Sequence, residues 1–159
     1  MIHLDIKQQD LWSYLDNSSS PVALYGTGDG ADKIIKVLEE RGLGNRVKAV
    51  FASDGFVRDR SFRGFKVESF DDARSRLGDD MTVLVCFGSS RPEVLANIER
   101  IAGICRTFIP DVPVCVETVF DSAFASENSD KLQHIYDLLE DDISRRCYEN
   151  YVNNKLTGR

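Results

Sequence analysis

Short apolar runs alternate with helix-like patterns over the first two thirds of the chain. Strands of the kind buried in parallel sheets are expected at residues 22–25, 47–52, 65–67, 82–87 and 105–109. Between them, apolar residues recur at helical spacing. This alternation predicts an α/β fold with a parallel sheet and helices on both faces. The right-handed crossover rule then favours a Rossmann-like strand order of 3-2-1-4-5.

Helical patterns flank this region on both sides. Residues 4–16 predict a short lead helix, and from residue 121 onward glycine and β-branched runs give way to two helical segments. We therefore expect a lead helix and linker at 1–20, a nucleotide-binding-type domain at 21–120 and a C-terminal helical appendage at 121–159.

Two neighbouring strands of the predicted sheet end in glycine-containing turns that open helices. Strands 22–25 and 82–87 flank the point where the strand order reverses, which is where open α/β sheets bind ligands. The candidate ligand-binding residues are Asp54, which follows strand 47–52, and the residues of these two turns: Gly26, Thr27, Gly28, Asp29, Gly30, Gly88, Ser89, Ser90 and Arg91.

The first of these turns fits the GxGxx[GA] form of the dinucleotide fingerprint through Gly26, Gly28 and Ala31. The first glycine permits a tight turn, the second lets the backbone approach a pyrophosphate, and the small third residue lets the helix pack close to the strand. Gly30 adds backbone freedom, and the amides at the helix start favour an anion. Alternatively, these glycines serve only a tight strand–helix turn.

Two acidic residues weaken the case for a dinucleotide. Asp29 lies inside the glycine turn and would repel a pyrophosphate unless it points away or contacts a sugar hydroxyl. The acid that holds a ribose is expected near Ala52, and Asp54 comes two residues later. Asp54 either reaches the ribose or forms the turn before Gly55, so a nicotinamide cofactor is in doubt.

The second turn, residues 88–91, offers backbone amides, two hydroxyls and a guanidinium to the same ligand. Ser90 has an alternative role as the N-cap of the following helix. A loop before the third strand carries basic and aromatic residues. Its basic residues either reach a phosphate or are solvated, and its aromatic residues are expected to pin the loop to the core. They are Arg58, Arg60, Arg63, Phe56, Phe62 and Phe65.

Composition narrows the classes of partner. A net charge of −6 with scattered basic residues argues against nucleic acid. There is no signal-peptide pattern and no apolar run near the roughly 20 residues that cross a membrane. Four cysteines without a CxxC pair indicate reduced thiols in a cytoplasmic protein, and the two histidines lie too far apart in the chain to support a zinc site.

Several strings occur in an order that resembles the N-terminal region of bacterial FkbM-family methyltransferases. They are residues 24–28, 51–58, 65–67 and 111–114, then Phe120-Asp121-x-x-Phe124, Leu138-Leu139-x-Asp141-x-x-Ser144-Arg145-Arg146 and residues 150–158. The resemblance implies an S-adenosylmethionine-dependent O-methyltransferase that acts on a sugar or related metabolite. It also implies that the methyl-donor domain follows Arg159. Leu24 occupies the place where a methyl-donor site needs an acid, so these residues hold no catalytic centre of that kind.

Three functions follow as hypotheses. The first is an accessory domain that binds a nucleotide or nucleotide-sugar and contacts its own C-terminal methyltransferase domain. The second is a structural or homo-oligomerisation module with a vestigial pocket. The third, a stand-alone oxidoreductase, lacks a catalytic Tyr–Lys pair or a proton-relaying histidine near the predicted cleft.

Overall fold

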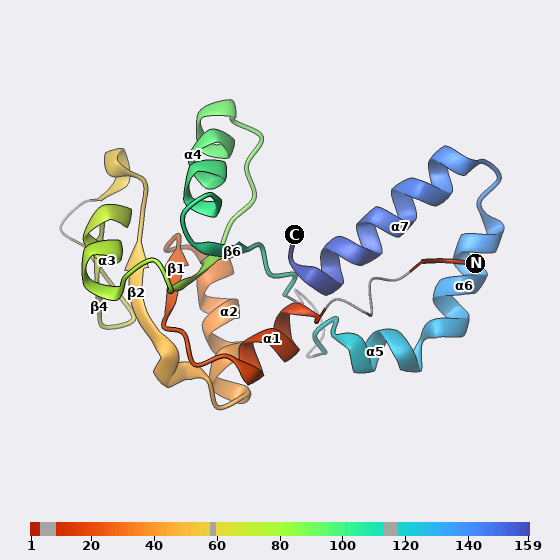
Figure 1. Ribbon diagram of the computed structural model, residues 1–159, viewed down its shortest axis with the longest axis horizontal. Coiled ribbons are helices and arrows are strands. Elements are labelled where there is room, and N and C mark those ends of the chain that lie inside the picture. The colour runs from red at the N-terminus through yellow and green to blue at the C-terminus, as the bar shows by residue number, and fades with distance from the viewer. Residues whose placement is uncertain (4–8, 58–59, 113–117) are drawn as a thin grey trace. The chain divides into compact units, whose positions relative to one another are not determined.

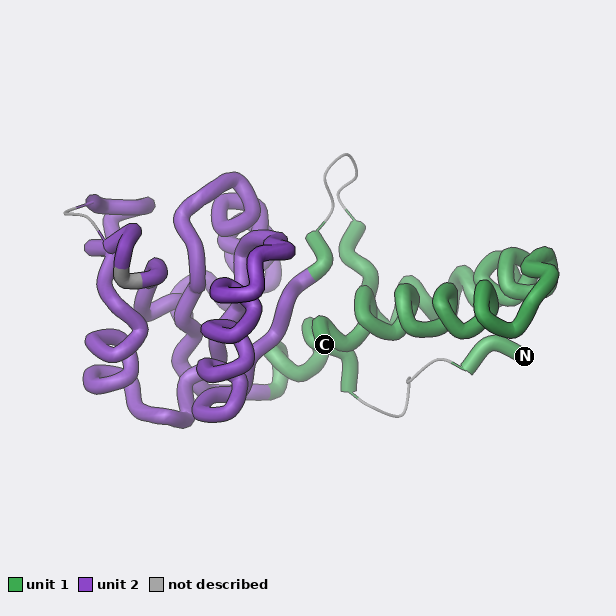
Figure 2. The backbone as a smooth tube through the Cα atoms, turned by 90° about the horizontal axis from the view of Figure 1, so that it is seen from above, with its two compact units in different colours: residues 1–17, 111–159 green, residues 18–110 purple. Residues whose placement is uncertain are grey.

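The computed structural model describes residues 1–3, 9–57, 60–112 and 118–159, apart from the side chain of Asp54 (Figure 1). The chain divides into two compact units (Figure 2). Residues 18–110 form one, here called the sheet unit. Residues 1–17 together with 111–159 form the other, here called the helical unit.

The sheet unit contains one six-stranded sheet with the order β3-β4-β2-β1-β5-β6. The strands are β1 (Val22–Tyr25), β2 (Val47–Phe51), β3 (Ser61–Phe62), β4 (Phe65–Glu68), β5 (Thr82–Val85) and β6 (Arg106–Phe108). All neighbours are parallel except β3 and β4, so the five parallel strands have the predicted order 3-2-1-4-5, which is confirmed. The additional strand β3 forms a hairpin with β4 through Arg63 and Gly64, whose φ angles are 47° and 82°.

The central strand β1 is fully buried, as its unbroken apolar run predicts. Its alternate residues point to opposite faces of the sheet. Ala23 and Tyr25 belong to a core cluster on one face, which includes Phe70 and Ala73 of α3 (Phe70–Leu77) and Ile101 of α4 (Pro92–Ala102). The other face is covered by α2 (Asp29–Glu40), whose apolar stripe is buried (Figure 1).

Local sequence explains where two of these helices begin. Ser69 caps α3 by accepting the amide N–H of Asp72 at 3.1 Å, and its hydroxyl donates to the Asp72 carboxylate at 2.8 Å. Pro92 occupies the first turn of α4, where a missing N–H costs nothing. Between β2 and β3, residues Asp54–Phe56 form a short 3-10 turn.

The helical unit contains α1 (Leu11–Asn17), α5 (Ser122–Glu127), α6 (Ser129–Leu138) and α7 (Asp142–Thr157). The tail was expected to hold two helical segments, but it holds three helices, because Asp121 caps a separate short helix by accepting the amide N–H of Phe124 at 2.9 Å. Helix α1 begins at Leu11, and the part of the predicted lead helix at residues 4–8 lies outside the described residues.

Asp10 connects the two ends of the chain within the helical unit. Its Oδ1 atom caps α1 by accepting the amide N–H groups of Trp12 and Ser13, each at 3.0 Å. Its Oδ2 atom accepts the hydroxyls of Ser13 at 2.6 Å and of Ser122, at the start of α5, at 2.7 Å. Only 2% of Asp10 is exposed to solvent.

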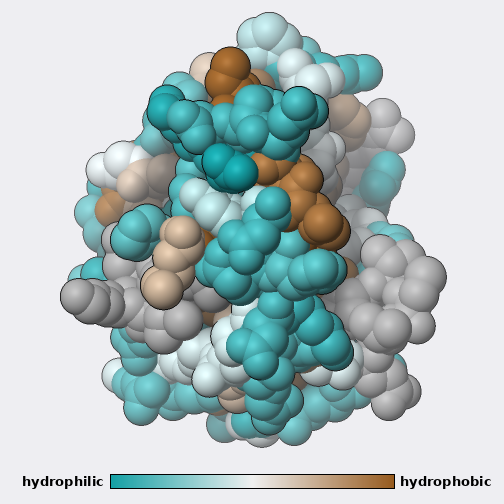
Figure 3. Space-filling model, turned by 90° about the vertical axis from the view of Figure 1, so that its right-hand side faces the viewer, coloured by the Kyte–Doolittle hydropathy of each residue, from teal (hydrophilic) through white to brown (hydrophobic). Residues whose placement is uncertain are grey.

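The surface over α6 and α7 is mainly hydrophilic with separate apolar spots (Figure 3). The exposed apolar side chains of these helices are Ile135, Leu138, Ile143 and Tyr151. In the part of the chain that the structure describes, no helix combines the length and the apolar character that crossing a membrane requires.

Candidate functional site

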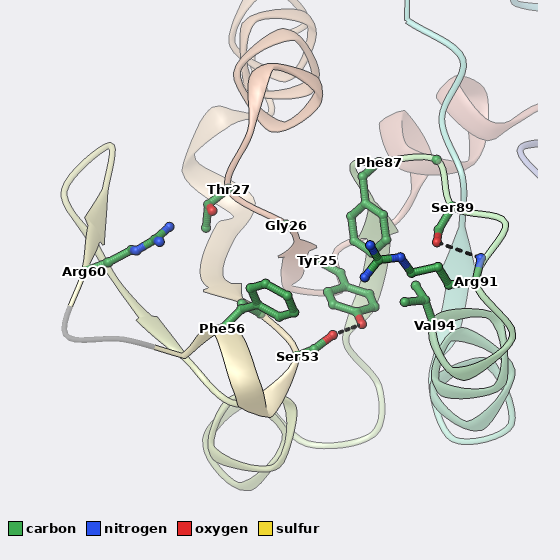
Figure 4. A pocket seen from close by; sticks show the side chains of 12 residues that line it. Tyr25, Gly26, Thr27, Ser53, Phe56, Arg60, Phe87, Ser89, Arg91 and Val94 are labelled. Atoms are coloured by element: carbon green, nitrogen blue, oxygen red, sulfur yellow. Dashed lines mark hydrogen bonds between the residues drawn. The ribbon is translucent and has the colours of Figure 1, made fainter.

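A pocket of about 310 Å³ opens in the sheet unit at the carboxyl ends of β1, β2 and β5 (Figure 4). It therefore lies at the point where the strand order reverses. Its lining comes from these strand ends, from the loops that follow them and from α4. The lining residues are Tyr25, Gly26, Thr27, Ala52, Ser53, Phe56, Arg60, Phe87, Gly88, Ser89, Arg91 and Val94.

Aromatic side chains form the apolar wall of the pocket. Tyr25 stacks on Phe51 with ring centroids 4.8 Å apart and meets Phe87 edge-on at 4.9 Å. Gly26 makes room for Phe87, since a Cβ atom at Gly26 would lie 2.9 Å from the Phe87 ring. Gly26 also has a φ of 120°, which a side chain would strain. The first glycine of the fingerprint is thus required by both backbone and packing.

The close approach between helix and strand occurs at Gly30. A Cβ atom there would lie 2.0 Å from the carbonyl oxygen of Cys86, so α2 reaches the end of β5 only because Gly30 has no side chain. The fingerprint assigned this role to Ala31, with Gly30 adding backbone freedom. Ala31 is fully buried, but Gly30 makes the tighter contact, and its φ is not in the left-handed region.

The predicted site residues divide into two groups. Five of them line the pocket together: Gly26, Thr27, Gly88, Ser89 and Arg91. Four others lie outside the lining: Gly28, Asp29, Gly30 and Ser90. The side chain of the tenth residue, Asp54, lies outside the described part of the structure. The fingerprint turn therefore contributes its beginning to the pocket, while its helical end packs against the protein.

Asp29 directs its charge away from any ligand at the pocket. Its carboxylate accepts from the Lys33 ammonium at 2.5 Å, one turn along α2, and its side chain is 80% exposed. Arg63 is also engaged elsewhere, because its guanidinium donates to Asp32 of the same helix at 2.6 Å. Both pairs lie on the surface of the sheet unit.

Arg60 and Arg91 bring positive charge to the pocket. They approach it from opposite sides in Figure 4, Arg60 from the loop before β3 and Arg91 from the start of α4. Among the described residues, neither guanidinium has a carboxylate within 4.0 Å, and no residue of the lining carries a carboxylate. As far as the described residues go, the two cations are therefore available to an anionic ligand.

Two local predictions for this region are wrong. Ser90 is not the N-cap of α4: Arg91 holds that position without a side-chain cap, and the Ser89 hydroxyl oxygen accepts the Arg91 amide N–H at 3.2 Å. Phe56 does not pin its loop to the core, because it is 61% exposed at the pocket, and Phe62 and Phe65 are only half-buried. In a small antiparallel hairpin, Phe62 and Phe65 pair with each other instead.

A chain of hydrogen bonds runs behind the pocket wall. The Arg100 guanidinium donates to Asn97 Oδ1 at 3.1 and 3.2 Å, and Asn97 Nδ2 donates to the Tyr25 hydroxyl at 2.9 Å. The Tyr25 hydroxyl in turn lies 2.5 Å from the Ser53 hydroxyl. Tyr25 and Ser53 both line the pocket, although Tyr25 is only 1% exposed (Figure 4). The chain thus connects α4 to the end of β2.

Cys86 follows β5 beneath this site and is held as a neutral thiol. Burial raises the pKa of Cys86 to about 12, and its thiol donates to the carbonyl oxygen of Leu84 at 3.2 Å. Since the thiolate is the reactive form, Cys86 is a packing residue. The described lining contains apolar, hydroxyl and guanidinium groups, a set suited to binding rather than to acid–base catalysis.

Sequence reasoning missed several lining residues. Ser53 follows the end of β2 and Phe87 follows the end of β5. Residues just beyond the carboxyl ends of such strands meet at a switch point, and this rule is the signal that could have identified both. Tyr25 was interpreted only as a strand residue, although its hydroxyl needs a partner when buried. Phe56 and Val94 reach the pocket through loop and helix geometry that no motif indicates.

Comparison with known proteins adds no assignment: no protein-family model, no curated protein and no solved structure matches the chain. The resemblance to FkbM-family methyltransferases stays a prediction.

Proposed function

We propose that the sheet unit binds a small organic ligand that carries an oxyanion, of the nucleotide or nucleotide-sugar class. The observation that carries this proposal is the pocket at the switch point, which Arg60 and Arg91 line together with the aromatic side chains of Tyr25 and Phe87. The guanidinium groups suit phosphate oxygens, and the apolar wall suits a base or sugar face.

The geometry favours a mononucleotide-sized ligand over a dinucleotide. A volume of about 310 Å³ is at the low end for small-molecule sites. Gly28, which the dinucleotide fingerprint places against the pyrophosphate, lies outside the lining. The anion is therefore expected beside Arg91 and Ser89 rather than on the start of α2.

A ligand panel tests this proposal directly. Thermal unfolding of the full chain is measured with uridine diphosphate, a uridine diphosphate sugar, adenosine monophosphate, NAD, inorganic pyrophosphate and S-adenosylmethionine. A ligand at 100 times its dissociation constant adds about 2.7 kcal/mol to the unfolding free energy. We expect a shift with the diphosphates and none with S-adenosylmethionine. The absence of a shift with every compound contradicts the proposal.

We further propose that this binding unit is an accessory domain of a methyltransferase acting on a sugar or related metabolite, with S-adenosylmethionine bound by a separate domain. The ordered strings shared with the FkbM family support this part. We also propose a cytoplasmic location, supported by the free thiols of Cys86, Cys105 and Cys147. Cys115 lies outside the described residues.

The second candidate function, a homo-oligomerisation module, is favoured by the exposed apolar side chains of α6 and α7. Leu138 is 70% exposed, Ile143 76% and Tyr151 59%. Light scattering of the chain and of its Tyr151→Asp variant tests this role. A dimer that the substitution dissociates supports the module, and a monomer at high concentration argues against it.

A further inference from the structure

The hydrogen-bond chain behind the pocket has a fixed direction, which begins at Arg100. A guanidinium has donors only, so the atom of Asn97 that faces Arg100 must be the amide oxygen. The amide nitrogen therefore faces Tyr25 and donates to its hydroxyl oxygen at 2.9 Å. The orientation of this amide is set by chemistry, because the reverse orientation would place N–H groups against N–H groups.

The same direction continues from Tyr25 to Ser53. The oxygen of Tyr25 accepts from Asn97, and its O–H hydrogen needs an acceptor because the residue is 1% exposed. Among the described residues, Ser53 Oγ at 2.5 Å is the acceptor that the structure shows for it. If Ser53 donated instead, the Tyr25 O–H hydrogen would be buried without a partner, which is unfavourable. Tyr25 is therefore the donor and Ser53 the acceptor.

We infer that Ser53 is a specificity-determining residue that presents its own O–H hydrogen to the ligand as a donor. Because its oxygen accepts the Tyr25 hydrogen, the Ser53 O–H is not used in that bond and is free to donate into the pocket that Ser53 lines. This inference rests on the proposed function and names the ligand chemistry more closely. With Arg60 and Arg91 as further donors, the pocket selects a group that only accepts hydrogen bonds, such as an ionised phosphate oxygen.

Asn97→Asp tests the direction of the chain. A carboxylate only accepts, so Tyr25 would donate to it, Ser53 would donate to Tyr25, and the lone pairs of Ser53 would face the anion. The double variant Asn97→Asp with Tyr25→Phe is the control. It adds the same negative charge, but the hydrogen-bond chain through the Tyr25 hydroxyl is absent. Tyr25→Phe deletes one oxygen and keeps the ring that packs on Phe51 and Phe87.

Affinities for inorganic pyrophosphate and uridine diphosphate are measured by isothermal titration calorimetry. We expect Ser53→Ala to weaken binding roughly 10- to 100-fold, the usual range for a hydrogen bond to a charged group. Ser75→Ala, an exposed serine of α3 outside the pocket, is the matched control and leaves affinity unchanged. Asn97→Asp should cost at least tenfold more affinity in the Tyr25 background than alongside Tyr25→Phe. Equal losses in both backgrounds, or affinity within twofold for Ser53→Ala, overturn the inference.

Neutron diffraction from a crystal of the unliganded chain keeps this inference separate from the proposed function. The map locates deuterium on the Tyr25–Ser53 pair even if neither probe binds. Deuterium on the Tyr25 oxygen directed at Ser53, with the Asn97 amide facing Tyr25, supports the inference. Deuterium on Ser53 directed at Tyr25 overturns it. A supporting map together with no binding of either probe removes the proposed ligand and leaves the direction of the chain standing.

Discussion

The backbone of Gly30 lies directly against the carbonyl oxygen of Cys86, and a Cβ atom at Gly30 would be 2.0 Å from that oxygen. Neither partner can yield easily, because one belongs to α2 and the other to the residue that follows β5. The start of α2 and one side of the pocket are thus positioned by a contact between two backbone segments.

Gly30→Ala should therefore displace α2 and destabilise the fold. Overpacking of this kind costs about 1–3 kcal/mol or more of unfolding free energy. Gly88→Ala is the matched control, since a Cβ atom there meets nothing within 4 Å and its φ is not in the left-handed region. Chemical denaturation of both variants measures the difference. Equal stability of the two variants would show that the Gly30 contact is not tight.

Arg60→Ala and Arg91→Ala should each weaken the binding of inorganic pyrophosphate by about tenfold, because each removes a charge-assisted donor. Affinity should also fall as salt concentration rises, since both groups are partly solvated. Arg63→Ala is the control: its guanidinium pairs with Asp32 outside the pocket, so affinity should not change. Calorimetric titration of the three variants with inorganic pyrophosphate measures these affinities. An equal loss in Arg63→Ala would point to general charge attraction rather than to a site.

Phe56→Ala should separate binding from stability. Phe56 is 61% exposed, so the unfolding free energy should change by less than about 0.5 kcal/mol. Affinity for uridine diphosphate should drop about 3- to 10-fold through lost contact with the base or sugar, while affinity for inorganic pyrophosphate stays the same. Phe51→Ala, a fully buried counterpart, should cost about 3–5 kcal/mol of stability. A large loss of stability in Phe56→Ala would restore the prediction that it anchors the loop.

Asp10 should make the helical unit sensitive to acid. Burial raises the pKa of this carboxyl, but hydrogen bonds from Ser13 and Ser122 outweigh burial and hold it below its usual value. A lowered pKa in the folded state means that the stabilisation is present above the unfolded value of about 3.9 and is lost as the pH falls below it. Unfolding free energies measured between pH 7 and pH 3 should show this decline.

Asp10→Ala should lower the unfolding free energy at pH 7 by about 1–3 kcal/mol and flatten its dependence on pH below 4. Asp141→Ala removes the side-chain cap of α7. Because Asp141 is exposed, this substitution should lower the unfolding free energy by less, about 0.5–1 kcal/mol. A pH profile that is as steep in Asp10→Ala as in the unsubstituted chain would show that the carboxylate is not the source of the decline.

The sheet was predictable because parallel strands buried on both faces have a distinctive sequence. Val22–Tyr25 and Thr82–Val85 are unbroken apolar or β-branched runs, and the crossover rule then fixes their neighbours. Strand β3 was not predicted, because two residues carry too little pattern. The separate helix at Ser122–Glu127 escaped notice for a similar reason: its start depends on one cap, Asp121.

The candidate site was predictable at its strand ends and not in its loops. Gly26 and Arg91 follow from turn chemistry next to β1 and β5. The fingerprint alone suggests that the whole turn faces a ligand, whereas the distance from Gly30 to Cys86 shows that its end is used for packing. The roles of Ser53 and Tyr25 depend on a partner, Asn97, that is distant in the sequence.

The short hairpin at the edge of the sheet has a consequence for how the protein behaves at high concentration. Strand β3 spans only Ser61–Phe62 and covers the open side of β4, so few main-chain groups remain there for another chain to pair with. The opposite border, Arg106–Phe108, is three residues long and begins with a cation. Both edge strands are therefore poor templates for pairing with a strand of another chain, the contact through which open sheets aggregate.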